Sequence, residues 1–424
     1  MRVFVRFLGA LLFISAFPPA AAGTIVQESG DLVDEIIDIK NAMPGRDSEG
    51  FDVPTVQELE NWRAVAGAML IHDFVSADSL VSAELPDYEM VEFLDTGFQN
   101  VVHYLLRERL PVSRGWGTYI VNPNHERSIM VQVPHPRYDL DTHIEGADLF
   151  RQTGSRFFLM AGTHRCANDS TSPCSGTSSV CGDGTYHVSD MAHYTDAPFQ
   201  AVHEVFDAGL SHLYAMSLHG NGRSNCEDIF LSNGHGSGSS PLLFSIKNAV
   251  LSEGGLTVAV AGDGSSCPLI GSTNVQGRVT NGSPDPCSTP AAANNGYFIH
   301  VEQHRSVRED PVEYGKLISA VNQTIGAVTG IVDPLPVARA ITLAPPWPNP
   351  GRAATVQLSV TVDQNVTLGV FDVTGRRRMV LFQGMLSAGT HPFHVERVSL
   401  PQGRYWISAY GTDARVSHPW MMIR

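Results

Sequence analysis

Short apolar runs separated by polar loops recur through the middle of this chain. Residues 128–134 form an almost continuous apolar run, which is typical of a strand buried on both faces. A helical pattern follows, and a second apolar run occupies 157–161. The order strand, helix, strand predicts a right-handed βαβ unit with parallel strands, and therefore an α/β domain. Further strands are expected at 118–121, 213–218, 256–261 and 297–301.

The helix after the first of these strands has a recognisable start and end. Thr142 and Glu145 have the spacing of a capping box, in which each side chain binds a backbone amide of the first turn. Gly154 suits the C-terminal end. The polar loop before this helix would lie at the carboxyl end of the strand, where open α/β sheets bind ligands.

Residues 23–110 read as a mainly helical lead-in packed on the α/β domain. Apolar residues at helical spacing over 55–71 predict a helix with Thr55 as its N-cap. A second helix is expected over 98–108.

The pattern changes after residue 332. A proline-rich connection covers 333–347, and short segments that alternate apolar and polar residues fill 348–424. Period-two alternation broken by frequent turns predicts a small β-sandwich. The α/β domain would therefore occupy 111–332, and an amphipathic helix over 312–332 would close it.

The chain begins like an exported protein. Residues 1–22 carry the charged, apolar and small-residue regions of a secretory signal peptide. No later apolar run reaches the ~18 residues of a membrane-spanning helix, so we expect a secreted chain without a transmembrane segment. The six cysteines lie between positions 166 and 287. An even number behind an export signal favours disulfides, with the pairing left open.

Charge excludes one class of partner. The formal net charge is −15, whereas nucleic-acid binding needs clustered Lys and Arg for the phosphates. The 43% of hydrophobic residues provides ample apolar mass for a large core. We therefore expect a folded protein with no nucleic-acid partner.

Three of the expected strands end in residues that suit a metal site. His135 and Asp139 follow the first strand, His219 ends another, and Glu302 ends the last. Zinc in hydrolases commonly takes three ligands from His, Asp and Glu and keeps a position open for water. Two histidines and one carboxylate as ligands, with a separate carboxylate as general base, would be a complete set for zinc-assisted hydrolysis.

Residues after the second strand would lie beside this loop. His164 and Arg165 follow the run at 157–161, and a cysteine-rich stretch over 166–186 has the composition of a stapled surface loop near the site. Arg165 or Arg308 could hold a substrate carboxylate through a bidentate pair.

Three short motifs resemble those of poly-gamma-glutamate hydrolases. HPRYDLDTHIEG looks like their metal-binding loop, SLHG like their second histidine site, and FIHVEQ like the strand that carries the catalytic glutamate. The resemblance places residues 110–332 in the superfamily of zinc carboxypeptidases, aspartoacylases, N-formylglutamate amidohydrolases and poly-gamma-glutamate hydrolases. It implies a mixed, mainly parallel sheet flanked by helices, one catalytic zinc and hydrolysis of an amide bond. Matched residue by residue, it implies His135, Asp139 and His219 as ligands and Glu302 as general base.

The spacing leaves alternatives for two of these roles. The zinc carboxypeptidase pattern is H-x2-E, whereas Asp139 lies four positions after the histidine. Asp141 is the first replacement as ligand, and Glu145 is the second because the capping box already uses it. His300 lies two residues before Glu302, on the same side of the strand. It could orient the base or substitute for it.

The last segment resembles the C-terminal sorting domains of type IX secretion and the related flagellar-hook-cap immunoglobulin-like modules. PNP, FDVTGR, SAGTHPFHV and LPQGRYWI carry this likeness, which covers nearly all of 341–424. It implies an immunoglobulin-like sandwich that addresses a bacterial protein to its export machinery or to the cell surface. The alternative is a sandwich that only stabilises the enzyme domain.

Together these features predict a secreted or bacterial cell-surface, zinc-dependent amidohydrolase or peptidase. Its substrate would be a peptide, gamma-glutamyl or N-acyl amino acid amide. The alternative is a non-catalytic surface binding or adhesion protein on the same fold. A third hypothesis is a metal-dependent esterase or phosphodiesterase.

Overall fold

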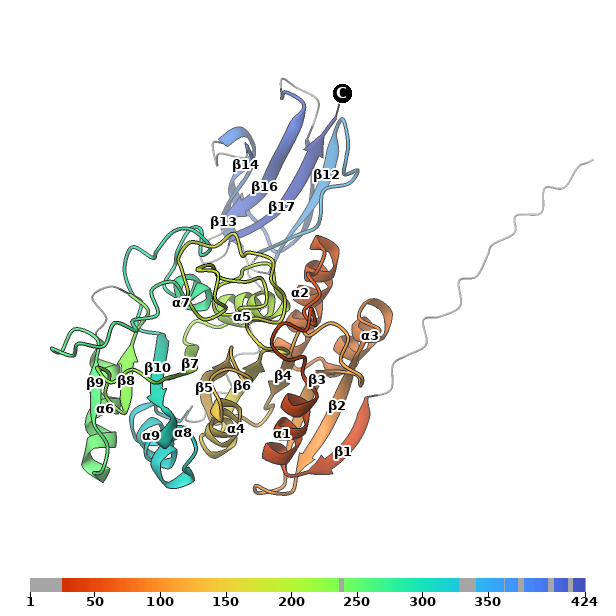
Figure 1. The fold of residues 1–424 in the computed structure, drawn as a ribbon. Helices are drawn as coiled ribbons and strands as arrows, with labels where there is room; N and C mark the ends of the chain where they lie inside the picture. Colours follow the sequence, from red (N-terminus) through yellow and green to blue (C-terminus); the bar gives the residue numbers. More distant parts are fainter. Residues whose placement is uncertain are drawn as a thin grey trace, which may run out of the picture. The chain divides into compact units, whose positions relative to one another are not determined.

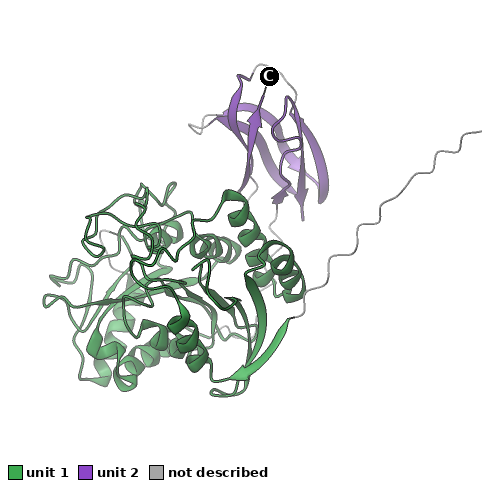
Figure 2. Ribbon diagram, turned by 45° about the vertical axis from the view of Figure 1, so that its right-hand side comes forward, with its two compact units in different colours: residues 1–327 green, residues 328–424 purple. Residues whose placement is uncertain are grey.

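A computed structural model describes residues 25–235, 240–327, 341–361, 363–372, 377–395, 400–410 and 415–423 (Figure 1). The chain divides into two units, residues 1–327 and 328–424 (Figure 2). The predicted signal peptide at 1–22 and residues 333–340 of the predicted linker lie outside the described residues.

A ten-stranded mixed sheet organises the first unit. Its strand order is β1-β2-β3-β4-β6-β5-β7-β10-β8-β9. The central strands β6, β5, β7 and β10 are parallel, whereas β3, β4 and β8 run antiparallel to a neighbour. This confirms the expected mixed, mainly parallel sheet. The strands are β1 (Val26–Gly30), β2 (Tyr88–Asp95), β3 (Val101–Glu108), β4 (Thr118–Val121), β5 (Arg127–Val133), β6 (Ser155–Met160), β7 (Tyr214–Asn221), β8 (Ile229–Ser232), β9 (Val258–Val260) and β10 (Phe298–His304).

Helices flank this sheet, and the two faces of β5 contribute to two separate cores. Val131 packs in the core formed with α1, α4, α6 and α9, and Met130 in the core formed with α2, α3 and α5. Burial on both faces explains the apolar run of β5. None of the described helices is long and apolar enough to cross a membrane. The helices are α1 (Leu32–Ala42), α2 (Val56–Leu70), α3 (Phe74–Glu84), α4 (Thr142–Gln152), α5 (Pro198–Gly209), α6 (Pro241–Glu253), α7 (Val275–Thr280), α8 (Arg305–Arg308) and α9 (Pro311–Thr324).

The segment before β4 contains both helices and strands. The helix predicted over 55–71 is α2, and Thr55 forms a capping box with Glu58 at its start. The helix predicted over 98–108 is wrong, because this segment forms strand β3. Antiparallel pairing with both β2 and β4 satisfies its backbone. Its β-branched and aromatic side chains suit such a pleated surface.

The helix after β5 begins differently from the prediction. Asp141 at its N-cap has a φ of 70° and makes no side-chain cap. The Thr142 hydroxyl donates to the backbone oxygen of Asp139 at 2.7 Å. Both carboxylate oxygens of Glu145 accept from Gln303 Nε2 at 2.8 Å. The capping box is therefore absent, because Glu145 is buried against β10 instead.

The closing helix is shorter than the predicted span of 312–332. It ends at Thr324, and residues 328–332 lie outside the described part of the chain. The side chain of Asp310 accepts from the backbone of Val312 at 2.9 Å and so caps the first turn.

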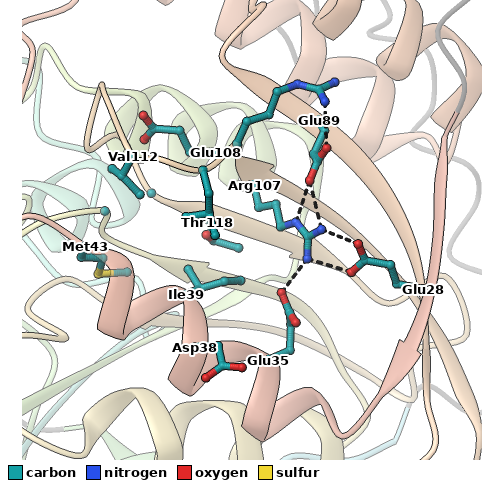
Figure 3. A pocket seen from close by; sticks show the side chains of 14 residues that line it. Glu28, Glu35, Asp38, Ile39, Met43, Glu89, Arg107, Glu108, Val112 and Thr118 are labelled. Atoms are coloured by element: carbon teal, nitrogen blue, oxygen red, sulfur yellow. Dashed lines mark hydrogen bonds and ion pairs between the residues drawn. The ribbon is translucent and has the colours of Figure 1, made fainter.

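An ion-pair cluster ties the edge strands to α1 (Figure 3). Arg107 on β3 lies 2.6 Å from Glu28 on β1, 2.6 Å from Glu35 on α1 and 3.0 Å from Glu89 on β2. One guanidinium group therefore joins three strands and a helix. Only 16% of this arginine side chain is exposed, so salt screens these pairs less than it screens surface pairs.

Three disulfides pair all six cysteines and confirm that prediction. They are Cys166–Cys181, Cys174–Cys287 and Cys226–Cys267. Disulfides persist in oxidising compartments and are rare in the reducing cytosol. The pairing therefore suggests an extracellular protein.

The second unit consists of two antiparallel sheets around one core. One sheet contains β11 (Ile341–Leu343), β12 (Ala354–Val360) and β15 (Gly389–Val395). The other contains β13 (Gln364–Asp372), β14 (Arg377–Leu386), β16 (Gly403–Tyr410) and β17 (Arg415–Met422). Val356, Leu368 and Trp420 are buried between them. This confirms an all-β unit, although its first strand begins inside the predicted linker.

Candidate metal centre

The carboxyl ends of three neighbouring strands, β5, β7 and β10, meet at one edge of the sheet (Figure 1). Ligand sites of α/β sheets lie at this end of the strands. His219 on β7 is directly opposite Glu302 on β10 in the strand register. His135 follows the last residue of β5, Val133, by two positions. The strands therefore deliver all three side chains to the same place.

His135, Asp139 and His219 converge there. His135 Nδ1 lies 3.1 Å from Asp139 Oδ2, and His219 Nδ1 lies 3.4 Å from the same oxygen. All three residues are buried. Their donor atoms lie close enough together to hold one metal ion. Two imidazole nitrogens and a carboxylate oxygen form a donor set that suits zinc.

Hydrogen bonds at the outer nitrogens orient both imidazole rings. His135 Nε2 lies 2.8 Å from Asp190 Oδ1, and His219 Nε2 lies 3.1 Å from Ser217 Oγ. With a metal bound, the proton would stay on Nε2 and leave each ring a lone pair on Nδ1, the nitrogen that otherwise hydrogen-bonds Asp139. Histidine ligands of metals are usually held by such a partner on the second nitrogen.

Asp190 is a site residue that the sequence prediction missed. Its buried carboxylate accepts from His135, from Arg165 Nε at 3.0 Å and from His193 Nδ1 at 3.1 Å. It lies in the long loop between β6 and α5. The loop has no regular apolar pattern, so the sequence does not predict where its side chains lie. The spacing D-x2-H of Asp190 and His193 is present in the sequence, but such a short motif has little specificity.

Electrostatics distinguishes the two carboxylates nearest His219. Burial disfavours the charge on Asp139, but hydrogen bonds from His135 and His219 outweigh it and hold the Asp139 pKa well below its usual range. Burial, followed by the charge of Asp139, raises the pKa of Glu302 to about 8. Burial also lowers the pKa of His219 to about 4. Asp139 is thus ionised and His219 neutral, which are the forms that bind metals.

Glu302 lies beside this group with part of its carboxylate free. Oε1 is 3.8 Å from His300 Nε2, and the buried Oε2 has no hydrogen-bond partner among the described residues. His300 is on the same side of β10, as predicted, and its ring centroid lies 4.7 Å from that of His219. Buried carboxylate oxygens are normally satisfied, so an orphaned one beside a potential metal site is a candidate base.

Among the described residues, two other groups of side chains could each hold a metal ion: His135 with Asp190 and His193, and His219 with His300 and Glu302. The remaining alternatives lie outside all three groups. Within the described residues, neither Asp141 nor His164 belongs to any of these groups. His164 Nδ1 instead accepts from the backbone nitrogen of Cys166 at 3.0 Å. Glu145 also lies outside them, since its carboxylate is bound by Gln303.

The two candidate substrate arginines have different surroundings. Arg165 is engaged by the carboxylate of Asp190 through Nε and Nη2. Arg308 is buried, and its Nε has no partner within the described part of the chain. A Cβ at Gly220 would lie 2.4 Å from Arg308 Cζ. A glycine is therefore needed at this position for Arg308 to lie beside the end of β7.

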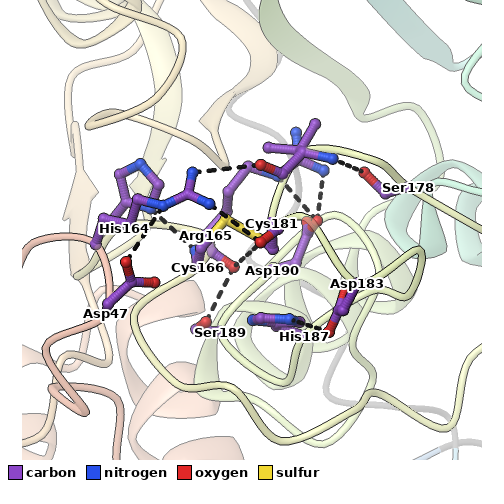
Figure 4. Close-up of a disulfide and its surroundings, with 12 residues drawn as sticks. Asp47, His164, Arg165, Cys166, Ser178, Cys181, Asp183, His187, Ser189 and Asp190 are labelled. Atoms are coloured by element: carbon purple, nitrogen blue, oxygen red, sulfur yellow. Dashed lines mark hydrogen bonds and ion pairs between the residues drawn. A yellow bond between two sulfur atoms is a disulfide. The ribbon is translucent and has the colours of Figure 1, made fainter.

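A disulfide holds the loop that carries Arg165 and Asp190 (Figure 4). Cys166, adjacent to Arg165, is bonded to Cys181. Ser189, adjacent to Asp190, donates its hydroxyl to the backbone oxygen of Arg165 at 3.0 Å. The cysteine-rich loop thus lies beside the candidate metal centre.

No protein-family model matches this chain, and no curated protein matches its sequence. Among solved structures, it is similar to N-formylglutamate amidohydrolase from Ralstonia eutropha JMP134, with 13% identity over 50% of this chain and 95% of that chain and a TM-score of 0.30. It is also similar to an alkylpurine DNA glycosylase from Pseudomonas fluorescens, with 14% identity over 21% of this chain and a TM-score of 0.15. The match spans 33% of the glycosylase chain. Likenesses this distant define neither a family nor an activity.

Proposed function

We propose that this chain is a secreted, zinc-dependent hydrolase of amide bonds. The observation that carries the proposal is the convergence of His135, Asp139 and His219 at one sheet edge, with Glu302 opposite His219 in the register. His135 and Asp139 share one loop, whereas His219 and Glu302 come from strands far along the sequence, and all four side chains are buried. Buried charged groups are costly unless they are paired or bind metals.

As the carboxylate ligand of zinc, Asp139 is better placed than Asp141 or Glu145. Asp139 faces both imidazoles through one oxygen, whereas Asp141 and Glu145 lie outside the group. Three such ligands leave a fourth position open, which is the arrangement of catalytic zinc sites.

The residues around this position suit hydrolysis. Bound zinc supplies Lewis acidity toward a carbonyl group and lowers the pKa of water. Burial raises the pKa of Glu302 to about 8, and a bound cation would favour its ionised form. Ionised Glu302 would accept the proton of the attacking water and return it to the nitrogen of the leaving amine. Its unpaired Oε2 is the atom assigned to this task.

The arginines are assigned separate tasks. Arg308, with a buried and unpaired Nε, would bind a carboxylate of the substrate. Arg165 would hold Asp190 and through it the ring of His135. The C-terminal bond of a peptide, a gamma-glutamyl amide and an N-acyl amino acid each place an amide near a free carboxylate.

Export is part of the same proposal. The signal-like residues 1–22 and the three disulfides support a secreted or cell-surface location. We assign the second unit to sorting by a bacterial export machinery, on the motif resemblance and its all-β structure. An immunoglobulin-like topology belongs to this assignment.

Metal analysis tests the centre directly. The purified protein should contain about one zinc per chain, and Asp139→Asn should lose it. Asp141→Asn is the matched control, because it changes the neighbouring acid outside the donor group, and it should retain zinc. Absence of zinc from gently purified wild-type protein would favour the surface-binding alternative.

Turnover tests the base. In a panel of peptide, gamma-glutamyl and N-acyl amino acid amides, the wild type should hydrolyse at least one compound. Glu302→Gln should lower kcat by about 10²–10⁴-fold while zinc content stays unchanged. Normal turnover in this variant would contradict the mechanism, and hydrolysis of ester analogues alone would favour the esterase hypothesis.

A further inference from the structure

The strand end that carries His219 has a second polar side chain on the same side of the sheet. Asn221 is the last residue of β7 and lies two positions after His219, so both side chains project to one face. In the strand register, His219 is opposite Glu302. Asn221 is opposite His304, the last residue of β10. Asn221 and Glu302 therefore lie on neighbouring strands, on the same face, one step apart.

A turn fixes the orientation of the Asn221 amide. Its Oδ1 accepts from the backbone nitrogen of Arg223 at 3.1 Å, as in an Asx turn. Because a backbone N–H binds an acceptor, this contact identifies the oxygen of the amide, and Nδ2 points elsewhere. His304 Nε2 donates to the backbone oxygen of Arg223 at 3.0 Å and so holds the same turn from β10.

The Nδ2 group of Asn221 is a buried donor without a hydrogen bond. The atom is shielded from solvent, yet among the described residues it has no partner in hydrogen-bond geometry. Glu302 Oε2 is buried and unpartnered in the same way. Buried polar atoms are normally satisfied, and an amide donor is complementary to a carboxylate oxygen. These two atoms are thus suited to bind each other.

The electrostatics of Glu302 supports this pairing. Burial, followed by the charge of Asp139, raises the pKa of Glu302 to about 8, whereas the amide of Asn221 acts in the opposite direction. A hydrogen-bond donor favours the ionised form of a carboxyl group because it binds the charge. His300 Nε2 lies 3.8 Å from Oε1, beyond hydrogen-bond distance. Asn221 is therefore better suited than His300 to hold the ionised carboxylate.

From these observations we propose that Asn221 is the positioning residue of Glu302. Its Nδ2 donates to the ionised carboxylate, and the turn at Arg223 fixes the direction of this bond. A carboxylate oxygen has two acceptor sites, so Oε2 can accept from Asn221 and still face the attacking water. The inference rests on the proposed function, because it concerns the base of that reaction, and it adds a residue that none of the sequence motifs assigned.

Asn221→Ser removes the amide donor and keeps an acceptor for the turn. A serine hydroxyl can bind the backbone nitrogen of Arg223, although more weakly than asparagine does. For an amide that the wild type hydrolyses, kcat should fall about tenfold, with KM and zinc content unchanged. Asn225→Ser is the matched control in the same loop, since the exposed Asn225 donates to the backbone oxygen of Ser266 at 2.9 Å. It should leave kcat unchanged.

Asn221→Asp gives a readout that a merely structural role would not move. The variant keeps Oδ1 for the turn and places a second negative charge beside Glu302. A like charge disfavours ionisation, so the pKa of Glu302 should rise. The base is active when ionised, and the acid limb of the kcat/KM profile should therefore move to higher pH. If Asn221→Ser fails to fold, this variant still decides the question.

A crystal structure of the zinc-loaded wild type measures the contact without turnover. Asn221 Nδ2 should lie about 2.7–3.2 Å from a carboxylate oxygen of Glu302, and a separation above roughly 3.5 Å would overturn the inference. An active wild type with unchanged kcat and pH profile in both Asn221 variants would also overturn it and leave the proposed function standing. A wild type without zinc and without turnover would overturn both.

Discussion

In the candidate metal centre, Nδ1 of His135 faces Asp139, and Nε2 of the same ring contacts Asp190 at 2.8 Å. Because Arg165 and His193 bind the same carboxylate, Asp190 is itself fixed in place. The negative charge of Asp190 also raises the basicity of the ring it contacts. A residue in a loop thereby determines how a strand-end histidine presents its lone pair.

Replacing Asp190 by Asn should therefore weaken zinc binding by about 10–100-fold. Asp183→Asn is the matched control, since Asp183 lies in the same loop and pairs with His187 at 2.8 Å, outside the metal groups. Competition with a chromophoric chelator measures both affinities. Equal affinity in the Asp190 variant and the wild type would mean that the ring of His135 is oriented by other contacts.

At the scale of elements, β3 carries a buried histidine that should make stability depend on pH. His103 is 1% exposed, packs near Phe150 with a centroid distance of 5.1 Å, and has no partner among the described residues on either nitrogen. Burial lowers its pKa to about 4. In an unfolded chain the imidazole has a pKa of about 6.5.

Between these two pKa values the unfolded chain binds the proton and the folded chain does not. Stability should therefore be complete above pH ~6.5 and fall as the pH drops toward 4, by about 3 kcal/mol for this single group. His103→Leu should remove that part of the loss. Calorimetric unfolding of the first unit at pH 7 and at pH 4 measures the difference, with the exposed His212→Leu as control. An unchanged pH dependence in His103→Leu would show that folding does not shift the pKa of His103.

Strands that are buried on both faces could be predicted from their apolar runs. A strand whose conformation depends on pairing with distant segments could not. The run at β5 and the ends of β7 and β10 follow from apolar patterning alone. Segment 101–108 forms strand β3 because it pairs with β2 and β4. A local sequence pattern carries no information on these distant partners. At the start of α4, the contact of Glu145 with Gln303, 158 positions away, replaced the local capping box.

The candidate site divides in the same way. The convergence of His135, His219 and Glu302 could be predicted because strand ends deliver them, and Asp139 follows His135 in the same loop. Their roles in catalysis stay predictions. Asp190 could not be predicted, since it enters from a loop whose course depends on a disulfide and on contacts with Arg165.

At the scale of the whole molecule, the chain contains two units with separate cores. The apolar clusters around the ten-stranded sheet draw no residue from the described part of the second unit. A unit with its own hydrophobic core can in principle fold alone. The metal groups among the described residues lie entirely in the first unit.

A chain ending at residue 327 should therefore fold, bind zinc as the full-length protein does and keep its activity. Circular dichroism and metal analysis of the truncated protein check this expectation. Loss of zinc from a well-folded truncated chain would show that the second unit contributes to the metal centre.

The Cys174–Cys287 bond closes a covalent ring of chain across a sequence separation of 113 residues. That ring contains β7 with His219, whereas His135 and Glu302 lie outside it. A protease that cuts one exposed loop inside the ring opens it without releasing a fragment. An exported enzyme nicked there would keep its pieces joined, and the break would become visible only after reduction.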